Sequence, residues 1–264
     1  MKITTWNINS VRLRASLVTK LLKDVQPDVL CLQETKCPDE LFPYQSFYDI
    51  GYRHIAVHGM KGYNGVALVS RLPFKNEQRL DWVDKSDCRH ISATFPKNIE
   101  LHNFYVPAGG DEPDIEKNEK FAHKLEFLKE VKEWFISERQ SADPIILVGD
   151  LNIAPLESDV WSHKQLLNVV SHTPVEVQHL NNLMNSLDWT DAIRHLIPEP
   201  EKLYTWWSYR ARDWAVSNRG RRLDHIWVTP PLLENIAGSS ISKTARGWEK
   251  PSDHVPVTTE LSIR

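Results

Sequence analysis

The sequence predicts a single α/β domain over residues 1–264, built on mixed β-sheet. Short apolar runs rich in β-branched residues alternate with amphipathic segments, without the strict strand–helix–strand order of a doubly wound parallel sheet. The composition, 41% hydrophobic and 25% charged, is that of a globular chain. No internal repeat, low-complexity tract or flexible linker interrupts it, so we expect one domain.

The individual elements follow from length and pattern. Eight apolar runs are short and β-branched enough to predict strands; they span residues 3–8, 29–33, 65–70, 91–95, 99–106, 145–149, 223–228 and 255–263. One helix is predicted over 11–22, with Ser10 as its N-cap. A second is predicted over 115–136, whose apolar residues recur at helical spacing and whose Glu and Lys residues are expected on a solvated face.

Composition also excludes several classes of protein. The three cysteines form no C-x-x-C pair, which argues against a disulfide framework and a cysteine zinc site. No secretory-signal pattern or membrane-length apolar run is present, so we expect a cytoplasmic protein without a membrane partner. Neither G-x-G-x-x-G nor a P-loop occurs, which disfavours a nucleotide cofactor.

Net charge is −3, yet residues 205–222 hold five arginines against the single acid Asp213. A local basic patch on an acidic body can bind phosphate, or it can be an ordinary solvated loop. The charge pattern alone leaves both interpretations open.

Polar side chains stand at the ends of five of the predicted strands. They are Asn7, Glu34, Asp150, Asn152, Asp224, Asp253 and His254. Their oxygen atoms suit a hard cation, Mg²⁺ or Mn²⁺, better than zinc. An Asp paired with a His is an acid–base arrangement, for which Asp224 and His254 are candidates. Each residue alone fits a turn, a cap or a structural histidine equally well, but their recurrence favours a shared site.

Six motifs carry a family resemblance. They are Trp-Asn-Ile-Asn at 6–9, Leu-Gln-Glu-Thr-Lys at 32–36, Tyr-Val-Pro at 105–107, Gly-Asp-Leu-Asn at 149–152, Arg-Leu-Asp at 222–224 and Ser-Asp-His-Val-Pro at 252–256. In this order they resemble the exonuclease III family of abasic-site DNA endonucleases, within the endonuclease/exonuclease/phosphatase superfamily. The resemblance covers essentially the whole chain. It implies a DNase I-like, four-layered α/β sandwich, with two mixed β-sheets packed face to face and helices outside.

The resemblance also implies roles for the polar residues. Glu34 would be the principal Mg²⁺ ligand, with Mn²⁺ as the alternative ion. Asp150 would orient or deprotonate the attacking water, and His254, polarised by Asp224, would contact a phosphate oxygen. Asn152 would hold the scissile phosphate or the nucleophile, and Tyr105 would lie near that phosphate. The full expected metal surroundings are Asn7, Glu34, Asp150, Asn152, Asp253 and His254. The sequence leaves open whether one or two ions act, and whether Tyr105 or Asp150 assists the leaving group.

For DNA, the resemblance implies that Trp206 and Leu223 line a pocket for a flipped-out abasic sugar. Because neighbouring strand residues face opposite ways, only one of Trp206 and Trp207 can do so. Phosphate and strand contacts are expected from four arginines, namely Arg89, Arg210, Arg219 and Arg222.

Three positions depart from the family pattern. Ala108 follows Tyr-Val-Pro where Asn or Gln is common, Asp111 stands where some relatives have a DNA-inserting arginine, and Arg221 replaces an aromatic or aliphatic pocket residue. These departures leave open the balance of endonuclease, exonuclease and phosphatase activities.

The expected function is that of a monomeric, Mg²⁺-dependent DNA-repair hydrolase. It would cleave double-stranded DNA 5′ to abasic sites in base excision repair, with 3′→5′ exonuclease and 3′-phosphatase action on damaged 3′ ends. The nearest alternative is mainly an exonuclease or 3′-end-processing enzyme with weak incision. A lipid or inositol phosphatase and a catalytically silent DNA-binding module are more distant alternatives. Action on damaged bases stays open.

Overall fold

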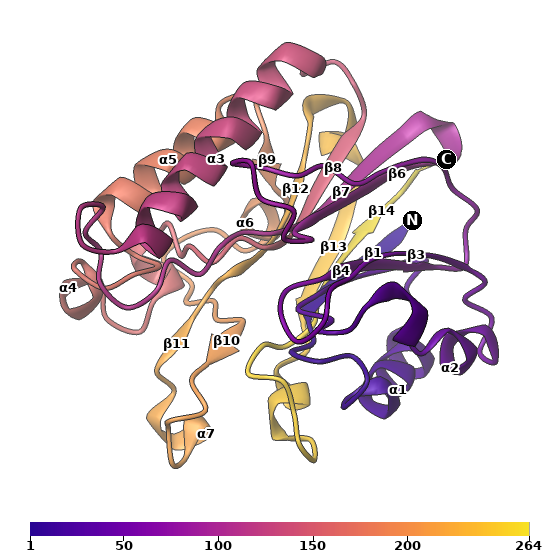
Figure 1. Cartoon of the computed structure of the whole chain (residues 1–264), viewed down its shortest axis with the longest axis horizontal. Helices are drawn as coiled ribbons and strands as arrows, with labels where there is room; N and C mark the ends of the chain where they lie inside the picture. The colour runs from indigo at the N-terminus through magenta and orange to yellow at the C-terminus, as the bar shows by residue number, and fades with distance from the viewer. Residues whose placement is uncertain (264) are drawn as a thin grey trace.

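Two six-stranded sheets pack face to face in the computed structural model, which describes residues 1–263, and helices cover their outer faces (Figure 1). The first sheet comprises, in spatial order, β13 (Ile236–Ile241), β14 (Val257–Leu261), β1 (Lys2–Asn7), β2 (Val29–Gln33), β4 (Val66–Ser70) and β3 (His54–His58). The second comprises β5 (Lys75–Gln78), β6 (His90–Phe95), β7 (Ile99–Tyr105), β8 (Ile145–Asp150), β12 (Asp224–Val228) and β9 (Thr190–Asp191). A separate ribbon pairs β10 (Trp206–Trp207) with β11 (Gly220–Arg221).

The helices are short apart from three. They are α1 (Ala15–Val25), α2 (Tyr44–Tyr48), α3 (Glu119–Glu138), α4 (His163–Leu166), α5 (Pro174–Met184), α6 (Ala192–Leu196) and α7 (Trp214–Ser217). Short 3₁₀ helices occur at Asp39–Leu41, Pro96–Asn98, Glu157–Asp159, Pro230–Asn235 and Lys243–Gly247. No helix within residues 1–263 has the length and apolar character needed to cross a bilayer.

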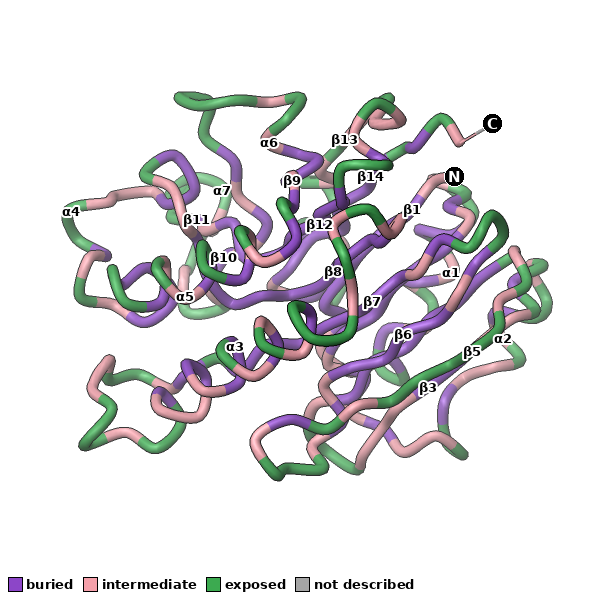
Figure 2. The backbone as a smooth tube through the Cα atoms, turned by 90° about the horizontal axis from the view of Figure 1, so that it is seen from above, coloured by how far each residue is buried: buried purple, intermediate pink, exposed green. Residues whose placement is uncertain are grey.

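The core consists of three apolar layers, because alternate residues of each strand face opposite sides of the sheet. Ile146 and Val148 of β8 face the first sheet, while Leu147 between them faces α3. Leu30 of β2 faces α1 on the other side of the molecule. The central strands are accordingly buried along most of their length, whereas the edge strand β5 is exposed, as are many loops and helix faces (Figure 2). The expected four-layered sandwich of two mixed sheets is confirmed.

Parallel pairing at the centre of each sheet brings the polar strand ends together. β1 pairs in parallel with β2, and β7 with β8, so the carboxyl ends of these strands lie at the same edge. β12 runs antiparallel to β8, and its first residue, Asp224, lies opposite Asp150, the last residue of β8. Five chain segments far apart in sequence therefore meet at one end of the sandwich.

Seven of the eight predicted strands have bounds within one residue of those observed, and the eighth is shorter, spanning Val257–Leu261. The prediction that Ser10 caps the first helix is wrong. That helix starts at Ala15, and the Ser10 N–H instead donates to the Glu34 carbonyl at 2.7 Å. The second helix runs over Glu119–Glu138, with Asn118 as its side-chain cap.

Candidate active site

Asn7 joins two carboxylates that come from different sheets. Its Nδ2 donates to Glu34 Oε1 and to Asp150 Oδ2, both at 2.8 Å. Asn7 ends β1, Glu34 follows β2, and Asp150 ends β8. The two acids lie close enough to act on one phosphate, and the amide holds them there.

Glu34 is held in an unusual backbone conformation and is favoured in its charged form. Its φ is +50°, a left-handed value that costs a non-glycine residue roughly 1–3 kcal/mol and persists where the surroundings enforce it. Tyr105 donates its hydroxyl to Oε1 at 2.9 Å, and Lys36 pairs with Oε2 at 2.7 Å. Burial would raise the pKa of Glu34, but Lys36 and Asn7 outweigh it and lower that pKa. Glu34 is therefore available as an anionic ligand.

His254 lies between two buried aspartates. Its Nδ1 donates to Asp224 Oδ2 at 2.9 Å, and its Nε2 lies 3.6 Å from Asp150 Oδ2. Burial alone would lower the pKa of His254, but Asp224 and Asp150 together raise it to about 10. Burial also raises the pKa of Asp150 to about 7, partly offset by the charge of His254. The sequence-predicted contact of Asp224 with His254 is confirmed.

Asp150 can reach this position because the residue before it is glycine. Gly149 has a φ of +141°, and a Cβ built there would lie 1.9 Å from the Phe104 carbonyl oxygen on β7. Only glycine permits this close approach of β7 and β8, which sets Tyr105 opposite Asp150.

Asn152 and Asp253 border the same centre. The Asn152 backbone N–H donates to Asp150 Oδ1 at 3.0 Å, and its Nδ2 donates to the Val106 carbonyl at 2.8 Å. Asp253 accepts from Asn9 at 3.2 Å and from the Trp206 indole at 2.9 Å. Asp253 therefore ties the carboxylate centre to the neighbouring aromatic ribbon.

A cavity of about 610 Å³ opens beside this centre. Glu34, Tyr105, Asn152, Asp253 and His254 lie along one wall. The other wall is aromatic, basic and apolar, and includes Trp161, Trp206, Arg210, Arg219, Arg221 and Leu223. The cavity thus joins an acidic centre to a surface suited to a sugar–phosphate chain.

Comparison with known proteins identifies the family. Residues 4–254 match the model of the Endonuclease/Exonuclease/phosphatase family. The chain belongs to this family. Exodeoxyribonuclease III of Haemophilus influenzae is 33% identical over 272 residues, covering 99% of this chain and 100% of the relative. The expectation drawn from the six motifs is confirmed at the family level.

Solved structures of the family agree over the full length. An AP endonuclease from Archaeoglobus fulgidus is 33% identical, with a TM-score of 0.93 and 100% coverage of both chains. The 3′-5′ exonuclease NExo from Neisseria meningitidis is 34% identical, with a TM-score of 0.91 and the same coverage. A second NExo structure is described as a 3′ phosphatase bound to a product DNA hairpin.

The residues expected at the DNA differ in their placement. Trp206, Leu223, Arg210 and Arg219 line the cavity, whereas Trp207 is 1% exposed and packs inside. Arg89 borders an adjoining hollow instead, with its guanidinium 4.9 Å from the centre of the Tyr105 ring.

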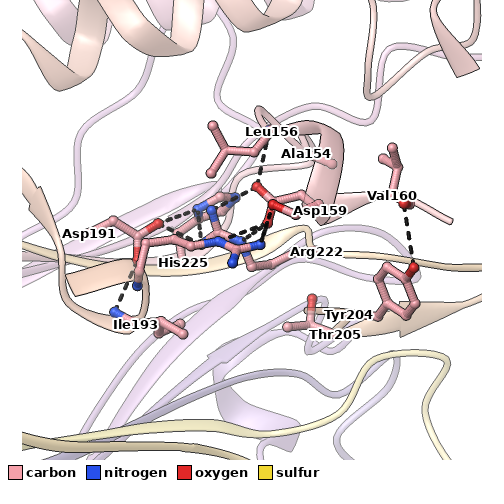
Figure 3. Close-up of polar contacts among 12 residues, drawn as sticks. Ala154, Leu156, Asp159, Val160, Asp191, Ile193, Tyr204, Thr205, Arg222 and His225 are labelled. Carbon is pink, nitrogen blue, oxygen red and sulfur yellow. Dashed lines mark hydrogen bonds and ion pairs between the residues drawn. The ribbon is translucent and has the colours of Figure 1, made fainter. Parts of the chain in front are cut away.

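The prediction that Arg222 contacts DNA is wrong. Its side chain is 1% exposed and pairs with Asp159, at 2.7 Å from Nε, and with Asp191 (Figure 3). Arg221 ends β11 and faces the cavity, whereas Arg222, the next residue, is turned into the interior and requires buried partners.

A buried ion pair beneath the site was missed. Lys124 of α3 and Glu176 of α5 are both 0% exposed and form a salt bridge. Lys124 Nζ also donates to the carbonyl oxygens of Asn152 at 2.8 Å and Ala108 at 3.3 Å. Lys124 was expected on a solvated helix face, but α5 covers that face. The Thr173-x-x-Glu176 capping box was a readable signal for the start of α5.

The donor set fits a hard divalent cation. Asp150, Asp224 and His254 place ligand atoms within 4.8 Å of one another, and Oδ1 of buried Asp224 has no hydrogen-bond partner in the described chain. Asp224 already pairs with His254, and Glu34 is the carboxylate of this centre that lines the cavity, so Glu34 is better placed to receive an ion. No thiolate lies among these groups, which agrees with an oxygen-binding metal.

Proposed function

We propose that this protein is a Mg²⁺-dependent phosphodiesterase that cleaves duplex DNA 5′ to abasic sites and also processes 3′ ends. The observation that carries the proposal is the pair of carboxylates bridged by Asn7, beside a cavity walled by Trp206 and Leu223. The names of the relatives, an exodeoxyribonuclease III, an AP endonuclease and a 3′-5′ exonuclease, support the same chemistry.

Glu34 would hold the metal ion, with Asn7, Asp150 and Asp253 close by and Asn152 and His254 completing its surroundings. Mn²⁺ could replace Mg²⁺, because both prefer oxygen ligands. A bound ion of this kind neutralises charge on the phosphate and on the departing oxygen.

The side chains around the proposed metal site have separate roles in the hydrolysis. Asp150 orients the attacking water and accepts its proton, a role to which its raised pKa is suited. His254, held by Asp224, presents a positive charge to the phosphate oxygens as negative charge develops. Asn152 positions the phosphate, and the Tyr105 hydroxyl lies beside it. The water oxygen bonds to phosphorus while the bond to the 3′ oxygen breaks, and that oxygen takes a proton.

Recognition would come from the opposite wall. Trp206 and Leu223 form an apolar surface that accepts a sugar without a base, while Arg210 and Arg219 contact DNA phosphates. Arg89 would meet the strand nearer Tyr105. We further propose a monomer acting in the cytoplasm, where a reducing environment agrees with the free thiols of Cys31, Cys37 and Cys88.

A second function, mainly 3′→5′ exonuclease or 3′-end processing, is favoured by two cavity residues. Ala108 and Asp111 line the cavity, and neither supplies the amide or guanidinium contact expected of a dedicated abasic-site enzyme. Weaker binding of internal abasic sites would make processing of 3′ ends the larger share of the activity.

The test uses labelled duplexes with one internal abasic-site analogue or a recessed 3′ end, with Mg²⁺, Mn²⁺ or EDTA. Metal-dependent incision at the lesion supports the main proposal. Shortening of the recessed end with little incision favours the second function. Binding of both duplexes without cleavage of either would mark a silent module and contradict both.

A further inference from the structure

Arg221 is a cation in the wall of the cavity, and within residues 1–263 it is the only one of the three cavity-lining arginines whose guanidinium is held by hydrogen bonds. It lies on β11, and its guanidinium stacks over Trp206 with 5.3 Å to the ring centre. Trp206 in turn is fixed by the hydrogen bond from its indole to Asp253. The charge is therefore attached to the same aromatic surface that is expected to receive the sugar.

The Arg221 side chain is held in place through one end of its guanidinium. Nη1 donates to the Val170 carbonyl at 2.9 Å and to Ser171 Oγ at 2.7 Å. Within residues 1–263, Nη2 makes no hydrogen bond but is open to solvent, and Nε is buried without an acceptor. Nη2 is thus a pre-positioned free donor, and binding a ligand there would cost little side-chain entropy.

The charge of Arg221 also lacks a counter-ion. No carboxylate in residues 1–263 forms an ion pair with it, whereas neighbouring Arg222 pairs with two aspartates. Burial lowers the pKa of Arg221, and Glu176, which lies behind Ser171, only partly opposes the shift. A partly buried cation with unused donors is stabilised by an incoming anion.

The acids of the cavity do not fill this role. Glu34 is engaged by Lys36 and Tyr105, and Asp253 by Asn9 and Trp206. Asp111, the third acid of the lining, forms no ion pair with Arg221 within residues 1–263. Within the described residues, none of the acids that line the cavity therefore neutralises the Arg221 guanidinium.

We propose that Arg221 makes the cavity selective for a group bearing a carboxylate beyond the scissile phosphate, so that oxidised, anionic sugar remnants at 3′ ends are preferred to neutral ones. The inference rests on the proposed function, since the group must be attached through the phosphate that the site cleaves. An uncharged sugar offers Arg221 only hydroxyl or carbonyl oxygens, whereas a carboxylate offers a charged acceptor that matches guanidinium geometry.

The reaction on such an end is a hydrolysis. For a 3′-phosphoglycolate, the bond between phosphorus and the 3′ oxygen breaks and a bond to the water oxygen forms. One water proton ends on the 3′ oxygen and the other on the released phosphoglycolate. No oxidant or further reactant is needed, and Arg221 takes no part in the bond changes, acting only on the group held in the cavity.

The experiment compares two recessed duplexes, one ending in 3′-phosphoglycolate and one in its neutral counterpart, 3′-phospho-2-hydroxyethyl. Values of kcat/KM are measured for wild type, R221L and R221Q, with the exposed R53L as a matched control. R221Q keeps a donor for Val170 or Ser171 but removes the charge, so it serves if R221L folds poorly. A purely structural role would lower both rates together, so the ratio between the two ends is the decisive readout.

Wild type and R53L are expected to prefer the glycolate end by about ten- to hundredfold, the usual worth of a charge-assisted hydrogen bond. R221L and R221Q should bring that ratio to about one. The role proposed for Arg221 is overturned if wild type uses both ends equally, or if the ratio is unchanged in folded R221L and R221Q. Either result leaves the proposed function itself intact. If wild type cleaves neither end and leaves an abasic duplex intact, the proposed function itself fails, and this inference with it.

Discussion

Lys124 and Glu176 form a wholly buried ion pair whose ammonium group also donates to the carbonyl oxygen of Asn152 at 2.8 Å. Helix α3 supplies Lys124 and helix α5 supplies Glu176, and the pair lies beneath the two loops that border the cavity. The pair thus links packing of α3 against α5 to the position of a residue expected at the phosphate.

Replacing Lys124 with Met should be costly, because it leaves Glu176 charged and buried without its cation. We expect the free energy of unfolding to fall by about 3–5 kcal/mol, measured by urea denaturation. The rate of incision per folded molecule should also fall, since the Asn152 carbonyl loses its hydrogen bond from Lys124. The double variant Lys124→Met with Glu176→Met should recover much of the stability. A single Lys124→Met variant as stable as wild type would contradict this account of the pair.

The arginines near the cavity should divide into two classes. Arg222→Met removes the partner of Asp159 and Asp191, so we expect a large loss of thermal stability. Arg210→Leu and Arg219→Leu should leave the melting temperature within a few degrees of wild type. They should weaken DNA binding and reduce the slope of log K against log salt by about one unit each. If Arg222→Met weakens DNA binding without lowering thermal stability, Arg222 is a DNA contact and not a buried structural residue.

The buried acids around Arg222 predict a dependence of stability on pH. Burial would raise the pKa of Asp191, but Arg222 and His225 outweigh it and hold the pKa well below the ordinary value of about 3.9. This stabilisation is present above that ordinary pKa and is lost as pH falls through and below it. Asp191→Asn should therefore be less stable than wild type at pH 6, with a difference that shrinks towards pH 2. A constant difference across this range would show that ionisation of Asp191 is not what stabilises the fold.

Asp224 should matter for rate more than for binding, because it orients His254 without reaching the cavity itself. Asp224→Asn is expected to lower kcat by about 10²–10³-fold, with little change in KM for the abasic duplex. The exposed Asp24→Asn is the matched control. A kcat close to that of wild type would leave the Asp224–His254 pair with a structural role only.

Much of the fold could be predicted because strands buried on both faces are apolar along their whole length. The strand over Val29–Gln33 was predicted residue for residue for this reason. The strand over Ile236–Ile241 was missed, since Gly238, Ser239 and Ser240 give it no apolar alternation. The exposed, wholly polar strand over Lys75–Gln78 offers no hydrophobic pattern at all. These edge strands form through pairing with a neighbour, and local composition does not encode that pairing.

The carboxylate centre was predictable because its members end or begin strands whose order forces them together. Arg222 was mispredicted because a run of neighbouring arginines does not indicate which side chain faces inward. Lys124 was mispredicted because a charged residue on an amphipathic helix is normally solvated, and only the packing of α5 buries it. Both errors concern charges whose partners lie far away in sequence.

The most direct test compares incision by wild type and Asp150→Asn on a duplex with one abasic-site analogue, in Mg²⁺, together with the affinity of each for that duplex. Wild type should release a fragment ending in a 3′-hydroxyl. Asp150→Asn should bind DNA with similar affinity but cleave it several orders of magnitude more slowly, because the attacking water loses its proton acceptor. Turnover of Asp150→Asn within a fewfold of wild type would contradict the central role given to Asp150.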